Sequence, residues 1–485
     1  MTRRGGLRFL TFFFVLAMPM VSFAQEAVIT GKIADTTGGV LPGVTVTAVH
    51  EATGTSFVAV TDSTGTYRMP VRIGTFRITA ELQGFATVTR TGVTLLVGQT
   101  AGIDIQMVPA SLQESVTVTA EAPLVDVHSS TVGANLDAKQ LSEIPLSGRN
   151  FVDLVMLAPG SRANEIGTNG TGGPVAHTGR SGGTQGTYQV NIDGQQVTAT
   201  VAGTFTTPNF SRESIAEFQF ISNRFDATQG RSSGVQVNVV TKGGTNNLSG
   251  SFTGNFRDSD WNAPDPVLHR KLPYSNQQYS GTIGGPIVLN KLHYFGNFEY
   301  ERQPLTSVWQ TPYPAFNVEL TGTRSVKMGG VRSDFEVTPN MRLMGKFNQS
   351  QLVEPFGPGT GNHPSGTNKN VEDNHDILGQ VTNVLSNRAV NEFRGGYAFY
   401  GINQTSLTSW SKHWQAPNGI TTDGPNITFR RFATGRNNNL PRFRDQGTWT
   451  VRDNFTLSYD AGGRHDLKAG AEYLHLLDNT RNCNR

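Results

Sequence analysis

The sequence has one cysteine, Cys483, among 485 residues. A single cysteine cannot form an internal disulfide, and it is too few for the cysteine-rich sites that hold structural zinc. Charged residues are also scarce, at 16% of the chain, against roughly 25% in typical soluble domains. The 40 basic and 37 acidic residues nearly cancel, which excludes a nucleic-acid-binding protein that depends on bulk positive charge.

Long apolar runs are missing after residues 1–24. That first segment starts with Arg3 and Arg4, continues as an apolar run and ends in a small-x-small site at Ala24, which is the layout of a cleavable signal peptide. A membrane-anchoring helix is the alternative, but the run is short and contains Pro19. Both Sec and twin-arginine export stay open. We expect an exported chain that, within a membrane, could only form a closed β-barrel.

Glycine is abundant, at 55 residues, and many short segments alternate apolar and polar side chains. Both features favour a mainly β fold. In residues 27–108 about seven such segments lie at regular spacing, and Asp62–Gly65 has Asp first and Gly last, as a type I turn prefers. This part of the chain is therefore predicted to be a small β-sandwich.

The segments GVLPGVTVTA and TDSTGTYRMPVRIGTFRITAELQGF resemble the carboxypeptidase regulatory-like domain, a carbohydrate-binding-like sandwich. The resemblance implies an accessory module. Metallocarboxypeptidases bind zinc through a His and a Glu three residues later, and none of the ten His residues here has a Glu at that spacing. We expect no enzyme activity, no metal and no cofactor. A packing role and a glycan-binding role both stay open for this domain.

Residues 110–121 are predicted to be a linker, and residues 122–245 a small α+β domain. Leu136, Leu141 and Ile144 recur at helical spacing and predict a short helix that ends at Pro145, with a second short helix after it. Further on, the sequence YQVNIDGQQV places Asp-Gly between two alternating segments. This pattern predicts a β-hairpin.

The stretches ESVTVTAEAPLVD, LSEIPLSGRNFVDLVMLAPG and IAEFQFISNRFDATQGRSSGVQVNVVTKGGTNNLSGS resemble the plug of TonB-dependent outer-membrane transporters, closest to the Oar-like subgroup. The resemblance implies a plug inside a barrel, driven by TonB with ExbB and ExbD. It also implies a TonB-contact segment, for which the candidates are Val116, Thr117, Val118 and Thr119. The first plug strand or a plain linker is the alternative. Arg149 either pairs with a carboxylate of the barrel wall or is a solvated residue at a helix end.

Residues 246–485 contain further alternating segments with aromatic residues, as in a transmembrane antiparallel β-barrel. A turn is predicted at Gly-Gly-Pro-Ile, residues 284–287. Short turns alternate with long polar loops near residues 352–371 and 404–446. About nine strands are expected, whereas transporters of this class close with about 22. We therefore expect part of a barrel and an N-terminal fragment of a longer protein, with a true nine-stranded protein as the alternative.

The sequence as a whole predicts a TonB-dependent outer-membrane receptor or transporter for energised uptake of a substrate too large for porins. Its sandwich would lie in the periplasm. The expected partners are TonB, outer-membrane lipid and lipopolysaccharide, and an unidentified extracellular substrate. Arginines around residues 430–444 are expected in a solvated loop near lipopolysaccharide. An exported glycan-binding or adhesive protein of the cell surface is the alternative.

Overall fold

The computed structural model describes three parts of the chain: an N-terminal sandwich, a middle domain and a large sheet. Its described residues are 27–110, 115–119, 132–137, 140–141, 161–162, 175–176, 188–198, 210–222, 235–266, 268–356, 363, 368–386, 388–406, 426–435, 440–460 and 464–482. The signal peptide, Arg149 and Cys483 lie outside them.

The N-terminal sandwich consists of two sheets. One has the order β4-β1-β7, with β8 also on β1, and the other has the order β3-β2-β5-β6-β9. Their strands are β1 (Ala27–Asp35), β2 (Thr45–His50), β3 (Ser56–Val60), β4 (Thr66–Val71), β5 (Gly74–Glu81), β6 (Thr87–Leu95), β7 (Thr100–Gly102), β8 (Ile105–Met107) and β9 (Ser115–Thr119).

Alternating side chains from both sheets form one core, which includes Ile29, Val46, Phe76 and Met107 at or near zero exposure. The predicted sandwich is confirmed, as is its turn: Gly65 has φ +71° and its N–H donates to the Asp62 carbonyl at 3.0 Å. At this conformation a residue with a Cβ would be strained.

The middle domain is a five-stranded sheet of order β10-β15-β16-β13-β14. Its core includes Val190, Ile192, Phe218 and Phe220. Its elements are β10 (Val132–Asp137), β13 (Tyr188–Ile192), β14 (Gln195–Gln196), η3 (Arg212–Ser214), β15 (Ile215–Ser222) and β16 (Val235–Thr241), with the separate pair β11 (Ser161–Arg162) and β12 (Val175–Ala176).

The helix predicted from Leu136, Leu141 and Ile144 is wrong at its start. Leu136 lies in β10, opposite Phe218 of β15. The spacing of three apolar residues fits a helix, but pairing with β15 decides the conformation. The rest of the two predicted helices falls almost entirely outside the described residues.

The large sheet is antiparallel and has nine strands among the described residues, in the order β17-β18-β19-β20-β21-β22-β23-β26-β27. The expected number is confirmed for this part of the chain. The strands are β17 (Ser249–Asp258), β18 (Ser275–Val288), β19 (Leu292–Trp309), β20 (Val318–Thr338), β21 (Met341–Glu354), β22 (Asn368–Ser386), β23 (Ala389–Ser406), β26 (Arg442–Asp460) and β27 (Arg464–Asn482). The loops add η4 (Ser259–Trp261), η5 (Pro314–Phe316), β24 (Asn426–Thr428) and β25 (Ala433–Gly435).

The two faces of the large sheet differ in polarity. One cross-strand row, set by the register, carries Ile283, Val331, Phe347, Ile377, Tyr397 and Trp449. Val331 is 61% exposed and Ile377 is 53% exposed, so this face is apolar and uncovered. Side chains at the alternate positions of these strands point to the other face of the sheet, and they include the buried Lys346, Asp376 and Glu392. An apolar outside and a polar inside are typical of a membrane β-barrel wall.

Short turns lie at one end of the large sheet and long loops at the other, as predicted. The turn predicted at residues 284–287 is wrong, because β18 continues to Val288 and pairs Pro286 with His293. The reversal comes at residues 289–291, where Asn290 has φ +61°. A register shift after Pro286 absorbs the proline within the strand.

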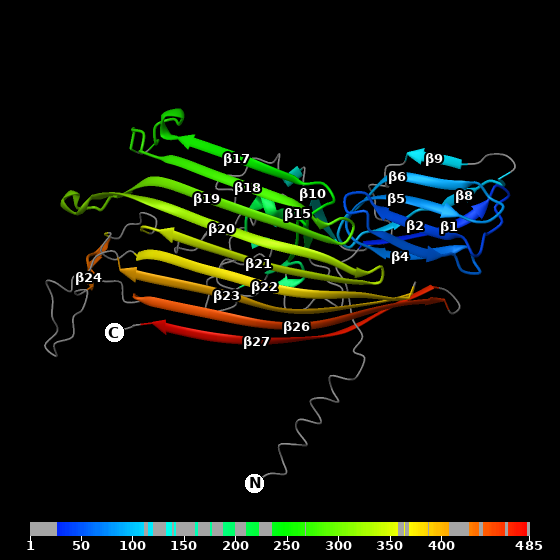
Figure 1. Ribbon diagram of the computed structural model, residues 1–485. Helices are drawn as coiled ribbons and strands as arrows, with labels where there is room; N and C mark the ends of the chain where they lie inside the picture. The colour runs from blue at the N-terminus through cyan, green and yellow to red at the C-terminus, as the bar shows by residue number, and fades with distance from the viewer. Residues whose placement is uncertain are drawn as a thin grey trace, which may run out of the picture.

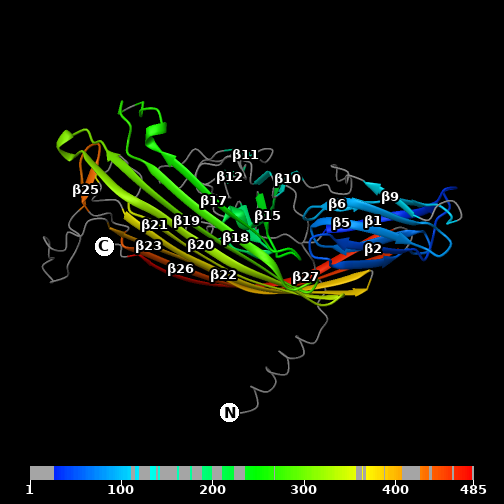
Figure 2. The ribbon, with the colours of Figure 1, turned by 45° about the horizontal axis from the view of Figure 1, so that its top comes forward.

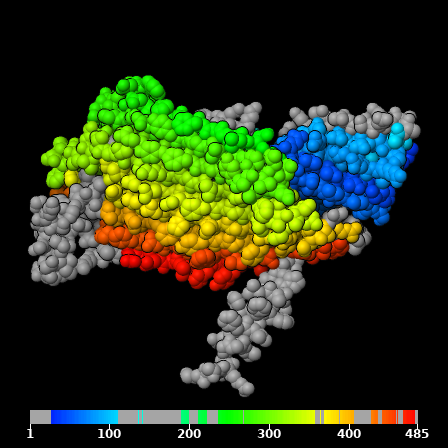
Figure 3. Space-filling model, viewed as in Figure 1, coloured from blue at the N-terminus to red at the C-terminus, as the bar shows by residue number. Residues whose placement is uncertain are grey.

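The sandwich lies beyond the short-turn end of the large sheet (Figure 1). The large sheet is curved, and strands β10 and β15 of the middle domain lie on its concave face (Figure 2). In the space-filling view the sandwich abuts the turn end of the large sheet (Figure 3). We call this end the rim. No helix in the part of the chain that the structure describes has the length and apolarity to span a membrane.

Candidate functional site

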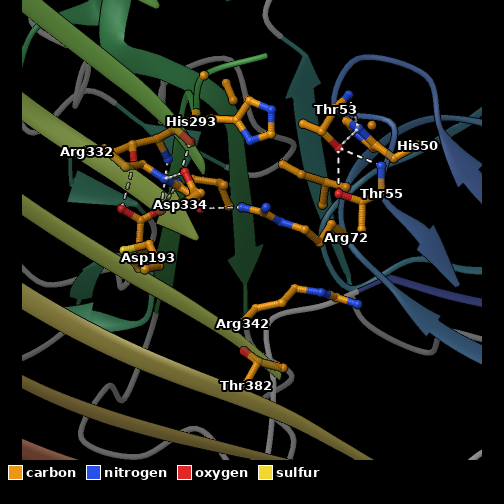
Figure 4. A pocket seen from close by; sticks show the side chains of 18 of the residues that line it. His50, Thr53, Thr55, Arg72, Asp193, His293, Arg332, Asp334, Arg342 and Thr382 are labelled. Carbon is orange, nitrogen blue, oxygen red and sulfur yellow. Dashed lines mark hydrogen bonds and ion pairs between the residues drawn. The ribbon is translucent and has the colours of Figure 1, made fainter. Parts of the chain in front are cut away.

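A cavity of about 380 Å³ lies where the sandwich, the middle domain and the rim meet (Figure 4). The sandwich contributes His50, Thr55 and Arg72, the middle domain contributes Asp193, and the rim contributes Arg332 and Asp334. All three parts therefore supply charged or polar side chains to one cavity.

Asp193 belongs to the tight turn between β13 and β14. Asp193 has φ +49° and Gly194 has φ +81°, which fits the predicted Asp-Gly hairpin. The Asp193 side chain is buried and accepts hydrogen bonds from the backbone N–H of Thr241 at 2.9 Å and from its hydroxyl at 2.8 Å. Burial alone would raise the pKa of Asp193, but Lys346 and Arg332 hold that pKa below its ordinary value.

Two cations of the large sheet face Asp193. Arg332 of β20 and Lys346 of β21 lie directly opposite each other in the register, so both side chains reach the same point on the inner face. Lys346 Nζ is 3.0 Å from Asp193 Oδ2, and Arg332 Nη1 is 3.5 Å from Oδ1. Lys346 also lies 3.6 Å from Asp376. The hairpin is thus held to the wall by a buried ion pair.

Asp334 extends this cluster to the sandwich. It lies two residues after Arg332 on β20 and therefore on the same face. Arg332 donates to both of its carboxylate oxygens at 2.8 Å. Arg72 of the sandwich donates to Asp334 Oδ1 at 2.5 Å. We name Arg72, Asp334, Arg332, Asp193, Lys346 and Asp376 the junction array; cations and anions alternate along it.

Further contacts hold the sandwich in place. The Thr55 hydroxyl donates to Glu336 of the rim at 2.8 Å. The Val97 N–H lies 2.8 Å from both carboxylate oxygens of Glu217 in the middle domain. The Arg342 guanidinium stacks 4.1 Å from the centre of the Phe57 ring. The sandwich therefore contacts the other two parts independently of the junction array.

The connector between β16 and β17, residues 242–248, is fixed at several points. Lys242 N–H donates to the Ser214 carbonyl at 2.7 Å, and Asn246 N–H donates to the Ala52 carbonyl of the sandwich at 2.8 Å. The Asn246 side-chain amide donates to Asn290 at 2.6 Å. A Cβ on Gly244 would lie 2.2 Å from the Tyr294 carbonyl oxygen, so the backbones approach closely here.

His50 lies on the sandwich side of the cavity. Its Nδ1 is 2.9 Å from the Thr53 hydroxyl, which donates to Thr55 at 3.0 Å, and the ring packs edge-on against Phe76. Burial, together with the charge of Arg72, lowers the pKa of His50 to about 4. His50 is therefore neutral near pH 7.

The candidate TonB-contact residues Val116, Thr117, Val118 and Thr119 lie in β9. This strand runs parallel to β6 of the sandwich, with Val118 opposite Arg90. The segment is therefore neither the first strand of the middle-domain sheet nor an irregular linker. Since β9 ends its sheet, no other strand of the described residues pairs with its second edge.

Arg149, the other candidate site residue, lies outside the described residues. Among the described residues, contacts between the middle domain and the wall include those of Asp193 and that of Ser211, whose hydroxyl donates to the buried Glu299 of β19 at 2.6 Å. Sequence reasoning marked Asp193 only as a turn residue. Charged side chains at alternate positions of strands β20 to β22 were the signal that could have marked its partners.

Among the described residues, no group of three or more His, Cys, Asp or Glu side chains is placed to hold a metal ion. The junction array contains no Ser, Cys or His nucleophile–base arrangement of the kind that covalent catalysis uses. Its alternating charges hold the sandwich and the middle domain against the wall.

Aromatic side chains gather at the opposite, loop end of the large sheet. Phe429 and Phe432 stack with ring centres 4.6 Å apart at the tip of the β24–β25 hairpin. Phe316 of the β19–β20 loop lies 5.2 Å from Phe432 and 5.7 Å from Phe429. Two loops that are distant in sequence are thereby joined. Arg430 and Arg431, which separate Phe429 from Phe432 in the sequence, are exposed.

A curved antiparallel sheet with an apolar outer face, a polar inner face and a folded domain on the inner face defines a β-barrel protein of the outer membrane. Two family models match the chain. The carboxypeptidase regulatory-like domain matches residues 28–108, and the outer membrane beta barrel domain matches residues 240–325 and 311–485, half of the chain. The chain belongs to the outer membrane beta barrel domain family, and it is an outer-membrane protein.

Known relatives point the same way. The chain is 26% identical over 295 residues to the TonB-dependent transporter Oar of Myxococcus xanthus, a match covering 57% of this chain and 27% of Oar. Its fold is similar to the outer-membrane transporter YddB of Escherichia coli, with a TM-score of 0.53 and 11% identity, covering 71% of this chain and 48% of YddB. It is also similar to FpvA of Pseudomonas aeruginosa, with a TM-score of 0.51 and 13% identity, covering 73% of this chain and 43% of FpvA.

The chain spans less than half the length of each of these three proteins. The structural likenesses concern the fold, because the sequence identities are low. The expected Oar-like resemblance and the expected mainly β fold are both confirmed.

Proposed function

We propose that this chain is part of a TonB-dependent transporter, in which the middle domain is the plug and the large sheet is part of the barrel wall. The observation that carries the proposal is the seat of the β13–β14 hairpin on the polar inner face, where Asp193 pairs with Lys346 and Arg332. A plug held by such pairs can be displaced and returned. Transport of this kind needs no covalent step, so we assign no enzyme activity.

The orientation follows from the two ends of the large sheet. Outer-membrane barrels have short turns on the periplasmic side and longer loops outside the cell. The rim has the short turns and also carries the sandwich, which we therefore place in the periplasm. The aromatic cluster of the loop end then faces the cell exterior, where substrate arrives.

The coupling partner in this proposal is TonB, with ExbB and ExbD. Strand addition uses main-chain hydrogen bonds to an unpaired edge. Strand β9 has one such edge among the described residues, and it lies between the sandwich and the plug in sequence. We infer that TonB pairs with the free edge of β9.

Val118→Pro tests this function. Proline lacks the backbone N–H and is excluded from the interior of a strand ladder. In the full-length protein we expect Val118→Pro to abolish binding of the TonB C-terminal domain and to abolish uptake, while the protein still reaches the outer membrane. Binding is measured by co-purification of the TonB domain from detergent extracts.

Val118→Thr is the matched control, because threonine keeps the backbone donor and the strand propensity. It should bind TonB and support uptake at near the wild-type level. Normal TonB binding by the proline variant would show that β9 is not the coupling strand.

A further inference from the structure

The junction array contains three cations and three anions, and the three parts of the chain contribute them unequally. The large sheet supplies Arg332, Lys346, Asp334 and Asp376, which cancel one another in charge. The sandwich supplies one positive charge, Arg72, and the hairpin supplies one negative charge, Asp193. The assembled array is therefore neutral.

The array is largely removed from water. Side-chain exposure is 1% for Lys346, 2% for Asp376, 5% for Asp193, 8% for Asp334 and 11% for Arg332, and only Arg72 is higher, at 30%. An unbalanced charge in such a setting is costly, because its attraction to water has been lost and not replaced. Glu392 and Arg394 beside the hairpin pair with each other at 2.7 Å and add no net charge.

Departure of either part alone unbalances the array. If the hairpin leaves, the array keeps Arg72, Arg332 and Lys346 against the two anions Asp334 and Asp376. If the sandwich leaves, the array keeps Asp193, Asp334 and Asp376 against the two cations Arg332 and Lys346. If both leave, the four residues of the large sheet remain, and they are neutral.

We propose that the junction array makes seating of the plug hairpin and docking of the sandwich mutually dependent, so that displacement of one loosens the other. The inference rests on the proposed function in that the plug moves, and it adds that the sandwich responds to that movement. Arg332 transmits the effect, because one guanidinium donates to Asp334 on the sandwich side and to the Thr241 carbonyl, at 2.8 Å, on the hairpin side. Arg332 and Asp334 are positioning residues for both parts.

Amide hydrogen exchange of the full chain in detergent micelles tests the coupling without TonB or uptake, so its failure is separate from a failure of the proposed function. The two readouts are the hairpin, residues 188–197, and the sandwich loop, residues 50–56. We expect Arg72→Met to speed exchange of the hairpin, which Arg72 does not touch, by about tenfold or more. Since binding couplings are reciprocal, Asp193→Asn should speed exchange of the sandwich loop by a similar factor.

The double variant Arg72→Met with Asp193→Asn gives the deciding result. It leaves a neutral array, so its effect on each segment should be smaller than the product of the two single effects. One control accompanies it. Arg77→Met removes an exposed arginine of β5 that lies outside the junction array, and it should leave the hairpin at the wild-type rate.

Continued protection of the sandwich core at residues 44–48 shows that the variants fold. Unchanged hairpin exchange in Arg72→Met would overturn the proposal. A double variant whose effect equals the product of the single effects would also overturn it, as would an Arg77→Met variant that matches Arg72→Met.

Discussion

At the scale of single residues, the neighbours of a titratable group decide whether that group is charged. His50 is held neutral by burial and by the nearby cations Arg72 and Arg342, with His293 also close. Asp193 is held ionised by Lys346 and Arg332. His50 and Asp193 line the same cavity, and the first is held neutral while the second is held charged.

The shifted pKa of His50 predicts a loss of stability in mild acid. The unfolded chain takes up a proton on this residue near its ordinary pKa of 6.5, whereas the folded chain does so only near 4. The contribution of neutral His50 to the free energy of unfolding is therefore complete above pH 6.5. It falls as the pH drops to about 4, by up to about 3 kcal/mol. Pulse proteolysis of the sandwich in urea, from pH 7.5 to 4.5, measures it.

His50→Gln is the control, because glutamine does not titrate. Its free energy of unfolding should change less between pH 7.5 and 4.5 than that of the wild type. Equal slopes in the two proteins would show that another group carries the acid sensitivity.

Gly194 is the second residue where local conformation decides the outcome. It has φ +81°, and a Cβ there would lie 2.6 Å from Arg394 Nη1. We expect Gly194→Ala to destabilise the hairpin by about 1–2 kcal/mol from the left-handed backbone alone, with an added cost for moving Arg394. Faster hydrogen exchange at residues 188–197 is the measurement.

Gly84→Ala offers a matched comparison, since Gly84 has φ +88° but nothing within 4 Å of its would-be Cβ. It should show the backbone cost alone. If Gly194→Ala lowers the stability no more than Gly84→Ala does, the Arg394 side chain moves away from the added methyl group without a measurable loss of stability.

At the scale of elements, alternation along each strand separates lipid from lumen. On β22, Ile377 is exposed on the outer face, and the neighbouring Asp376 is buried beside Lys346 on the inner face. Ile377→Arg should therefore destabilise the protein in lipid vesicles by about 2–4 kcal/mol, as expected for a lipid-facing position near the membrane midplane. Urea unfolding in vesicles gives the value.

Val371→Arg is the corresponding change on the same strand and face, six residues nearer the loop end. There the cost should be only about 0–1 kcal/mol, since charged side chains are tolerated near the interface. Equal costs at the two positions would contradict the depth assigned to Ile377.

Strands and turns were predicted well where neighbouring residues in the sequence determine them, and less well where pairing with a distant strand determines them. The alternation of residues 27–108 and the Asp193-Gly194 turn are set by neighbours in sequence, and both are found. The charged partners of Asp193, Arg332 and Lys346, are more than a hundred residues away in sequence. A shift of one residue in the β20–β21 register would put these two side chains on opposite faces of the sheet. For the same reason the sequence could not tell that Leu136 belongs to a strand.

At the scale of the whole molecule, the sandwich has a core of its own. Its buried cluster is made only of residues 27–107. Residues 27–110 expressed alone should therefore unfold in one cooperative transition. Residues 27–119 should be more stable, because they add β9 to the edge of β6. Circular dichroism during urea titration compares the two.

If residues 27–119 are no more stable than residues 27–110, β9 pairs with β6 only when the rest of the protein is present. If residues 27–110 show a disordered spectrum, the sandwich depends on its contacts with the rim.

The fixed connector at residues 242–248 determines the order in which the middle domain can unfold. Asn246 ties this connector to the sandwich, and Lys242 ties it to η3 of the middle domain, so the end of β16 is held in place. A pull that enters from the N-terminal side reaches β10 long before it reaches this anchor. We therefore expect the middle domain to unfold from β10 first and to stay attached through β16, so that it refolds against a strand that is still in place.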